Sequence, residues 1–302
     1  MRIYLSATED LYKPSGAAVR MRHLLVSYAV TRNAQSRFNT ALAQAGDPHS
    51  YVIDSGAHLY ISQYFKHGRI DERAVPEKHM REFMTVCRTL ERRPAFVVEM
   101  DLQDLYGLPV VEQWREELCI PFEHETGIPV CYVWHGNDGR RGWDALLRDD
   151  RKRVLGIGGK IISKGGLSGG DAQAMVLDAY AAGKAVHGFA QVKTDVMRTV
   201  PFSSVDSTSW GSAAIYGSTS VFDAASGTVR KRYAGRRDFA LHPDKAMGVL
   251  LTTGGRVRRD DMQNAAGTVK VYQEAVNAYD QQEQFFTAWW LAKGVDWSKH
   301  GW

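Results

Sequence analysis

The chain has 302 residues, of which 44% are hydrophobic and 24% are charged, and its formal net charge is +4 at pH 7. This composition is typical of a globular protein with a sizeable core, and so weak a charge neither requires nor excludes a nucleic-acid partner. The chain has three cysteines and no Cys-x-x-Cys pair, which predicts a protein without disulfides. The first segment lacks the apolar core of a signal peptide, and no apolar run approaches about 18 residues. We therefore expect a cytoplasmic protein without a membrane span.

Eight short apolar segments are the predicted strands, at residues 2–7, 23–29, 51–54, 95–101, 129–135, 154–159, 185–190 and 202–206. Helical patterns fall between several of them, at 77–93, 112–126, 143–151 and 171–182, the last with Asp171 as its expected N-cap. Residues 191–201 leave space for only a short helical turn. The alternation predicts a parallel α/β fold, and eight strands predict a closed (β/α)8 barrel, the TIM-barrel architecture, over residues 1–220.

Residues 221–302 differ from the rest of the chain. They contain predicted helices at 243–251 and 260–279, an aromatic tail, and a basic cluster of Arg230, Lys231, Arg232, Arg236 and Arg237. We expect a basic segment and C-terminal helices packed on the barrel. Arg and Lys beside Tyr233 are typical of a surface that follows phosphates, although a solvated charged face has the same composition.

Three aspartates, Asp54, Asp101 and Asp206, each stand at the end of an apolar run. The C-terminal ends of barrel strands converge on one face, so we expect these carboxylates to meet there. A carboxylate can attack a sugar C1′ as a nucleophile, and it can accept hydrogen bonds from the N–H edge of guanine. Each aspartate also has a structural interpretation. Asp54 would cap a helix, Asp101 and its strand neighbour Glu99 would form ion pairs, and Asp206 would belong to a turn.

His58, His135 and His187 also fall near predicted strand ends, and with the carboxylates they suggest a metal-dependent hydrolase. Their spacing matches neither His-x-His nor His-Glu-x-x-His. The run from Gly156 to Lys160 looks like a phosphate loop, but isoleucine follows the lysine where that motif needs Ser or Thr. We interpret it as a strand that ends in glycines, whose backbone is open to a ligand.

The order of these motifs resembles that of the tRNA-guanine transglycosylases over roughly residues 1–220. The resemblance rests on Asp54-Ser-Gly, the strand end at Asp101, Gly158-Gly159 and Val205-Asp206-Ser207. It implies that Asp206 is the nucleophile, Asp54 the general acid/base, and Asp101 the reader of the base's Watson–Crick edge. The other substrate-binding positions that it implies are Ser55, Gly56, Gly158, Gly159 and Lys160, together with His135 and Gly136, which stand where the family has glutamine and glycine.

The chain departs from the tRNA-modifying enzymes because no cysteine follows Cys131, so their Cys-x-Cys-x-x-Cys zinc site is missing. It also has no counterpart of the archaeal RNA-binding domains. It therefore looks more like the DNA-guanine transglycosylases of phage and bacterial genome-modification systems, which protect DNA from nucleases. This resemblance implies exchange of guanine in DNA for a 7-deazaguanine such as 7-cyano-7-deazaguanine, DNA binding by the basic cluster, and no metal or other cofactor. The alternatives are the same exchange on tRNA, a metal-dependent barrel hydrolase, and a non-catalytic nucleic-acid-binding barrel.

Overall fold

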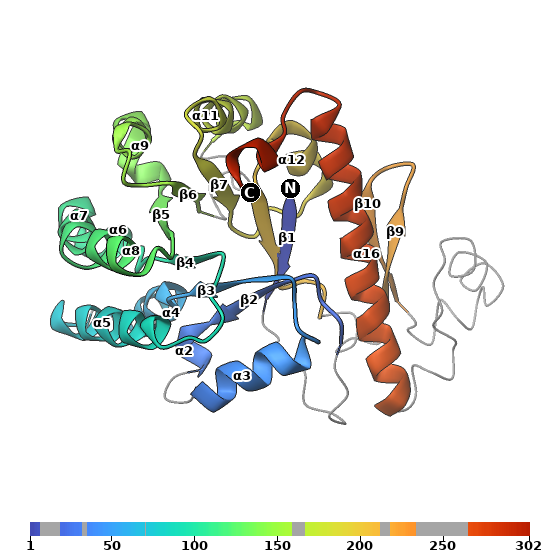
Figure 1. Ribbon diagram of the computed structural model, residues 1–302, viewed down its shortest axis with the longest axis horizontal. Coiled ribbons are helices and arrows are strands. Elements are labelled where there is room, and N and C mark those ends of the chain that lie inside the picture. The colour runs from blue at the N-terminus through green and yellow to red at the C-terminus, as the bar shows by residue number, and fades with distance from the viewer. Residues whose placement is uncertain (7–18, 32–34, 70, 159–166, 212–217, 234–264) are drawn as a thin grey trace.

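The computed structural model describes all residues except 7–18, 32–34, 70, 159–166, 212–217 and 234–264. Its centre is a closed barrel of eight parallel strands in chain order (Figure 1), so the predicted (β/α)8 fold is confirmed. Each predicted strand overlaps one of these. The strands are β1 (Arg2–Leu5), β2 (His23–Ser27), β3 (Ser50–Asp54), β4 (Phe96–Val98), β5 (Val130–Trp134), β6 (Val154–Ile157), β7 (Ala185–Gly188) and β8 (Ser204–Ser207).

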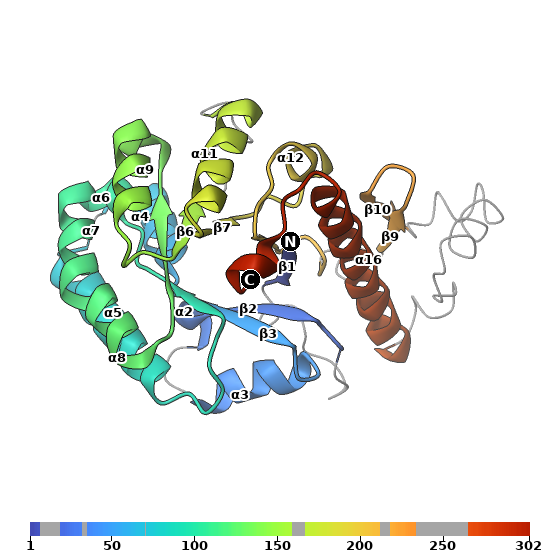
Figure 2. The same cartoon turned by 45° about the horizontal axis from the view of Figure 1, so that its top comes forward.

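Helices surround the barrel on its outside (Figure 2). They are α2 (Tyr28–Thr31), α3 (Gln35–Gln44), α4 (Ala57–His67), α5 (Ala74–Arg88), α6 (Gln103–Tyr106), α7 (Leu108–Trp114), α8 (Ile120–Thr126), α9 (Gly139–Arg148), α11 (Gly169–Ala181), α12 (Thr194–Thr199) and α16 (Ala265–Leu291). Short 3-10 turns are η2 (Gly136–Asp138) and η4 (Trp297–His300). The short turn expected before β8 is α12. The helix expected at 243–251 lies outside the described residues.

Two helix details differ from the expectation. A π-helical turn, η1 (Arg115–Cys119), separates α7 from α8 within the predicted helix 112–126. The N-cap of α11 is Ser168, not Asp171, because the Ser168 hydroxyl accepts the backbone N–H of Asp171 at 3.1 Å. Asp171 instead accepts a hydrogen bond from that hydroxyl. Ser168 is the better cap because its backbone is extended while its oxygen faces the first turn.

The barrel interior is a packed core and not a channel. It is filled by Tyr4, Leu25, Val52, Phe96, Val98, Cys131, Val133, Val154 and Ala185. Because side chains alternate along a strand, a residue two positions after an interior residue also points inward. By this rule Asp54, two residues after Val52, points inward at the C-terminal end of β3.

Helix α16 packs along β1, and the hairpin of β9 (Ser218–Asp223) and β10 (Thr228–Tyr233) lies on its other side (Figures 1 and 2). On the barrel side, Glu283 accepts the N–H of Ile3 at 2.8 Å and lies 3.2 Å from Nε2 of His23. On the hairpin side, a Cβ at Gly227 would come within 2.5 Å of the Phe285 ring. Helix α16 therefore covers the barrel beside β1, and the hairpin is an insertion between β8 and this helix. Among the described helices, none combines the length and apolar character that crossing a membrane requires.

Candidate active site at the C-terminal end of the barrel

The barrel brings the three predicted aspartates to the same end. Asp54 is the last residue of β3, Asp206 lies in β8, and Asp101 follows β4 by three residues. The thiol of Cys131, on strand β5 next to β4, lies near two of them, Asp54 and Asp101. Burial raises its pKa well above the usual range, and the nearby charges of Glu99, Asp101 and Asp54 act in the same direction. Asp54 and Asp101 are thus both near enough to Cys131 for their charges to act on its thiol.

Asp206 is held from the end of strand β7. Its Oδ1 accepts the backbone N–H of Ala190 at 2.7 Å, and Nε2 of His187 lies 3.5 Å from the same oxygen. The side chain is only 11% exposed, and no described residue donates a hydrogen bond to Oδ2. One carboxylate oxygen thus accepts a backbone N–H, and the other has no donor among the residues that the structure describes. This is the arrangement that a carboxylate nucleophile requires.

Asp101 forms part of a charged cluster that sequence reasoning did not find. His135, directly after β5, places Nε2 3.0 Å from Oδ2 of Asp101 and Nδ1 3.1 Å from Oδ2 of Asp104. The backbone N–H of His135 donates to Asp138 at 2.8 Å. Carboxylates only accept hydrogen bonds, so both ring nitrogens must carry protons. Burial lowers the pKa of His135, but the hydrogen bonds and charges of Asp101 and Asp104 outweigh it and raise the pKa to about 9. His135 is therefore an imidazolium at neutral pH.

Glu99 has the structural role that the sequence left open. It is fully buried and binds Arg115 through two hydrogen bonds, of 2.7 and 2.5 Å, and it also accepts the N–H of Val133 at 2.6 Å. Strand β4 ends at Val98, and beyond it Glu99 binds Arg115 while Asp101 binds His135. Arg115 also donates to the carbonyl of Val133 at 2.9 Å. This ion pair joins the ends of β4 and β5 to the helix behind them.

Two of the predicted substrate-binding residues, directly after Asp54, make structural contacts within the protein. Ser55 is buried, its hydroxyl donates to the carbonyl of Glu99 at 2.7 Å, and its own carbonyl lies 2.8 Å from Nε2 of His79. Gly56 precedes α4 with φ 89°, and a Cβ there would lie 2.3 Å from Cβ of Ala29. Only glycine fits this close approach with that backbone conformation. Both residues therefore fix the turn that follows Asp54.

The other predicted binding residues are placed as follows. Gly136 is exposed at the start of η2, and Gly158, half-buried after β6, donates its N–H to the carbonyl of Trp134 at 3.3 Å. Gly159 and Lys160 lie outside the described residues. In the basic cluster, Arg230 pairs with Asp223 at 2.6 Å. The side chains of Lys231 and Arg232, in β10, and the whole of Arg236 and Arg237 are not described, so DNA binding by this cluster stays a prediction.

The three histidines of the hydrolase alternative do not gather at one place. His58 is exposed on α4 and lies 3.2 Å from the hydroxyl of Ser62, whereas His187 is fully buried inside the barrel. His135 is bound by its two aspartates. Within the described part of the chain, no three His, Cys, Asp or Glu side chains are grouped so that they could hold a metal ion.

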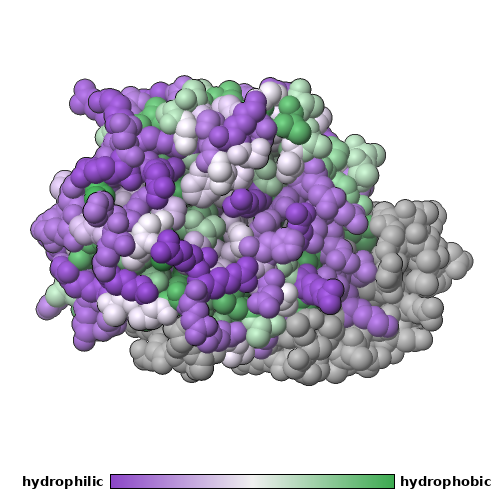
Figure 3. Space-filling view, in the orientation of Figure 1, coloured by the Kyte–Doolittle hydropathy of each residue, from purple (hydrophilic) through white to green (hydrophobic). Residues whose placement is uncertain are grey.

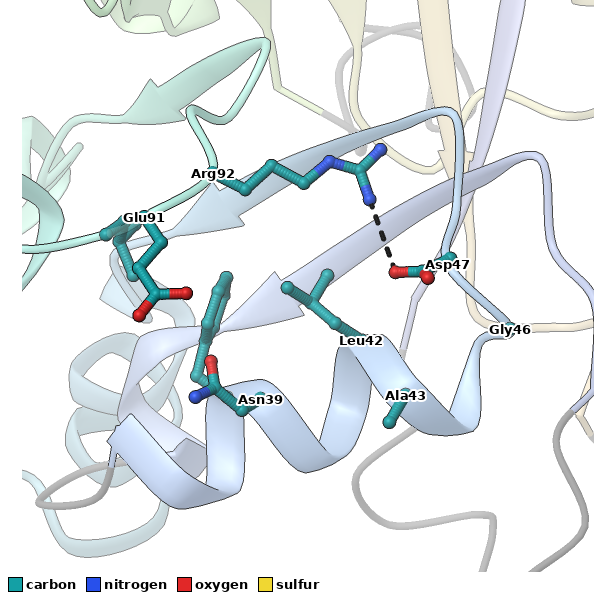
Figure 4. A pocket seen from close by; sticks show the side chains of 9 residues that line it. Asn39, Leu42, Ala43, Gly46, Asp47, Glu91 and Arg92 are labelled. Atoms are coloured by element: carbon teal, nitrogen blue, oxygen red, sulfur yellow. Dashed lines mark ion pairs between the residues drawn. The ribbon is translucent and has the colours of Figure 1, made fainter.

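A hollow of about 470 Å³ lies at the opposite end of the barrel, between α3 and the segment after α5 (Figure 4). Asp47 and Arg92, an ion pair at 3.7 Å, stand on its rim just before β3 and β4 begin. It contains none of the predicted site residues. On the face seen in Figure 3, the coloured surface is mostly hydrophilic, with apolar residues in small groups.

Comparisons of the chain with protein-family models, with curated proteins and with solved structures found no match.

Proposed function

We propose that this chain is a base-exchanging glycosyltransferase, which replaces guanine in DNA with a 7-deazaguanine base through a covalent intermediate on Asp206. The observation that carries this proposal is the state of the Asp206 carboxylate. Its Oδ1 accepts the Ala190 N–H at 2.7 Å, while Oδ2 receives no hydrogen bond from a described residue. A carboxylate oriented in this way at the C-terminal end of a barrel strand is suited to attack an electrophilic carbon.

The reaction consists of two displacements at C1′ of the nucleotide. In the first, a bond forms from Oδ2 of Asp206 to C1′ while the C1′–N9 bond breaks. The departing guanine keeps the electron pair of that bond and takes a proton from Asp54. In the second, Asp54 takes the N9 proton of the incoming 7-deazaguanine, N9 attacks C1′, and the Asp206 carboxylate is released. Two displacements on opposite faces retain the configuration of the sugar. Asp54, at the end of β3 across the barrel mouth, supplies the acid/base group.

Asp101 and His135 form the base-recognition side of the proposed site. The His135 imidazolium holds Oδ2 of Asp101 at 3.0 Å, and no described residue donates to Oδ1. That oxygen can accept from the N1–H and amino edge of guanine. The same edge is present in 7-deazaguanines, which explains how one site would accept both the departing and the incoming base.

A guanine inside a duplex hides both C1′ and its pairing edge, so the nucleotide must be flipped out or presented in a single strand. The barrel mouth is where such a nucleotide would enter. The basic cluster from Arg230 to Arg237 is the proposed contact for the flanking phosphates. Salt should weaken binding through these contacts, because phosphate neutralisation releases counterions.

Exchange of radiolabelled guanine into DNA and into tRNA, measured side by side, tests the proposal. We expect label in DNA with the wild-type protein and none with Asp206→Ala, whereas DNA binding by the variant persists. Label in tRNA alone would show that the substrate is tRNA and would favour the tRNA alternative. Wild-type protein that binds DNA but exchanges guanine in neither substrate would contradict base exchange and favour a non-catalytic barrel.

A further inference from the structure

His187 is the most deeply buried histidine near the candidate site, and no role described above explains it. It is fully buried on β7, with ring-centroid distances of 4.5 Å to Phe189, 5.4 Å to Phe96 and 6.2 Å to Tyr4. Three aromatic rings thus surround the imidazole inside the barrel. A polar ring in such an apolar place is costly unless both nitrogens have partners.

Within the described part of the chain, only one of these nitrogens has a hydrogen-bond partner. Nδ1 lies 2.9 Å from the hydroxyl of Ser204, whereas Nε2 is buried and has no hydrogen-bond partner among the described residues. The nearest charged group is the proposed nucleophile, since Nε2 lies 3.5 Å from Oδ1 of Asp206. This distance is slightly longer than a formed N–H···O bond. A small movement of the carboxylate would complete the bond.

The position of the ring proton follows from these neighbours. If Nδ1 carried the proton, the bare lone pair of Nε2 would face the negative Asp206 oxygen, which is repulsive. If the Ser204 hydroxyl donates to Nδ1, the proton sits on Nε2 and points at Asp206, and the small movement of the carboxylate satisfies both nitrogens. The second hydroxyl at this place, that of Ser203, donates elsewhere, to the carbonyl of Val186 at 2.8 Å. The Asp206 oxygen therefore favours the proton on Nε2, and the Ser204 hydroxyl is the donor that this tautomer needs at Nδ1.

We propose that His187 is a positioning residue for Asp206: its Nε2–H, with the Ser204 hydroxyl as donor to Nδ1, holds Oδ1 together with the Ala190 N–H, so that Oδ2 is the oxygen that attacks C1′. This inference rests on the proposed function and extends it to two residues beneath the nucleophile. Strand β7 and the turn directly after it supply the two groups that hold Oδ1. When Oδ2 becomes an ester oxygen, Oδ1 becomes the carbonyl oxygen of that ester and keeps these two donors. The same contacts therefore orient the carboxylate before attack and during its release.

The first test does not depend on activity. Nitrogen NMR of the whole protein labelled at histidine distinguishes the two tautomers of the buried His187, identified as the signal lost in His187→Gln. We expect the proton on Nε2 in the wild-type protein and a mixture of tautomers in Ser204→Ala. A proton on Nδ1 in the wild-type protein would overturn the inference, whatever the enzyme does.

The second test measures adduct formation with guanine-containing DNA in a single turnover. His187→Leu keeps the volume and removes the donor, and we expect the rate constant to fall about 10- to 100-fold, the loss for a hydrogen bond to a charged group, with KM for DNA unchanged. His187→Gln places an N–H near the position of Nε2 and should restore most of the rate. His124→Leu, an exposed histidine on α8, is the matched control and should behave as wild type.

The outcomes separate the two proposals. An Nε2–H tautomer in wild-type protein that forms no adduct would overturn base exchange and leave the hydrogen-bond arrangement standing. Normal adduct formation by His187→Leu would overturn the positioning role and leave base exchange standing. If His187→Leu fails to fold, His187→Gln and Ser204→Ala decide. In that case a lowered rate in Ser204→Ala with a retained rate in His187→Gln supports positioning, and wild-type rates in both variants contradict it.

Discussion

The backbone N–H of Ala190 donates to Oδ1 of Asp206 at 2.7 Å, and Ala190 adopts a left-handed backbone conformation, φ 55°, to do so. A residue with a Cβ is strained in this region by about 1–2 kcal/mol. The strain lies at the end of β7, directly after Phe189, where the chain turns over the barrel mouth. It is one of only two positive-φ residues other than glycine among the described residues, the other being Asp47. Strain that aims an N–H at a carboxylate is typical of a functional position.

Ala190→Gly should therefore stabilise the protein, because glycine adopts this conformation without a steric penalty. We expect an increase of about 0.5–1 kcal/mol in the free energy of unfolding, after allowing for the greater freedom of glycine in the unfolded chain. Guanine exchange should be retained, since the N–H remains. The matched control is Ala182→Gly, where φ is −81° and the same replacement should destabilise. Denaturant unfolding of both variants measures this, and equal destabilisation would contradict the argument.

Gly56 and Gly68 provide a pair of glycines that differ in their surroundings. Both have positive φ, at 89° and 63°, but a Cβ at Gly56 would lie 2.3 Å from Ala29, whereas nothing lies within 4 Å at Gly68. Gly68→Ala should cost about 1 kcal/mol from backbone strain alone. Gly56→Ala adds a collision and should cost about 2–4 kcal/mol. Thermal unfolding compares them, and equal losses would show that the contact with Ala29 is unimportant.

The charge of His135 should depend on its two aspartates. Burial lowers its pKa, Asp101 and then Asp104 raise it, and the result is a pKa of about 9. Because the folded-state pKa lies above the ordinary value of 6.5, the stabilisation is complete below about pH 6.5 and is lost as pH rises through about 9. Proton NMR titration of the ring measures the pKa directly. Asp101→Asn should lower the pKa by about 1–3 units, and Asp104→Asn by less, since Asp104 is more exposed. A ring that titrates near 6.5 in the wild-type protein would refute this.

Asp280 on α16 should make stability depend on pH in the neutral range. Burial and then the charge of Glu283 raise its pKa to about 7, against a smaller lowering by Arg22. Because the pKa of Asp280 is higher in the folded than in the unfolded chain, its contribution to the free energy of unfolding is greatest below about pH 4. This contribution is lost as the pH rises to about 7. Asp280→Asn should therefore be more stable than wild type by about 1–2 kcal/mol above pH 7 and similar to it near pH 4. Melting curves at the two pH values test this. An Asn variant without an advantage at the higher pH would contradict it.

The barrel could be predicted from sequence because its strands are apolar runs separated by amphipathic helices, a pattern that local residues determine. The hairpin of β9 and β10 was not expected. Its sequence, such as Ser218-Thr-Ser, lacks the apolar runs of the barrel strands, and the hairpin is held by long-range packing such as that of Gly227 against Phe285. The start of α11 also differs from the predicted start, because the Ser168 side chain, and not Asp171, caps the first turn of the helix.

The candidate site was predictable only in part. The strand-end aspartates Asp54 and Asp206 follow from the chain alone, because their place at the end of an apolar run fixes their place in the barrel. The cluster of Asp101, His135 and Asp104 does not, since His135 follows β5 whereas Asp104 lies in α6, and no local pattern records their pairing. Glu99 was ambiguous for the same reason. Its partner Arg115 comes close to Glu99 only because the helical segment after β4 packs back against the barrel, and no local sequence pattern predicts that contact.

The most direct test of the central claim is mass spectrometry of the wild-type protein after incubation with guanine-containing DNA, followed by peptide mapping. The account predicts DNA attached, through C1′ of a sugar that has lost its guanine, to the peptide that contains Asp206. This species is released when 7-cyano-7-deazaguanine is added, and it is absent with Asp206→Ala. The contrary result is an adduct that maps to another residue or forms equally well in Asp206→Ala, or wild-type protein that exchanges guanine without any adduct. Any of these would show that Asp206 is not the nucleophile.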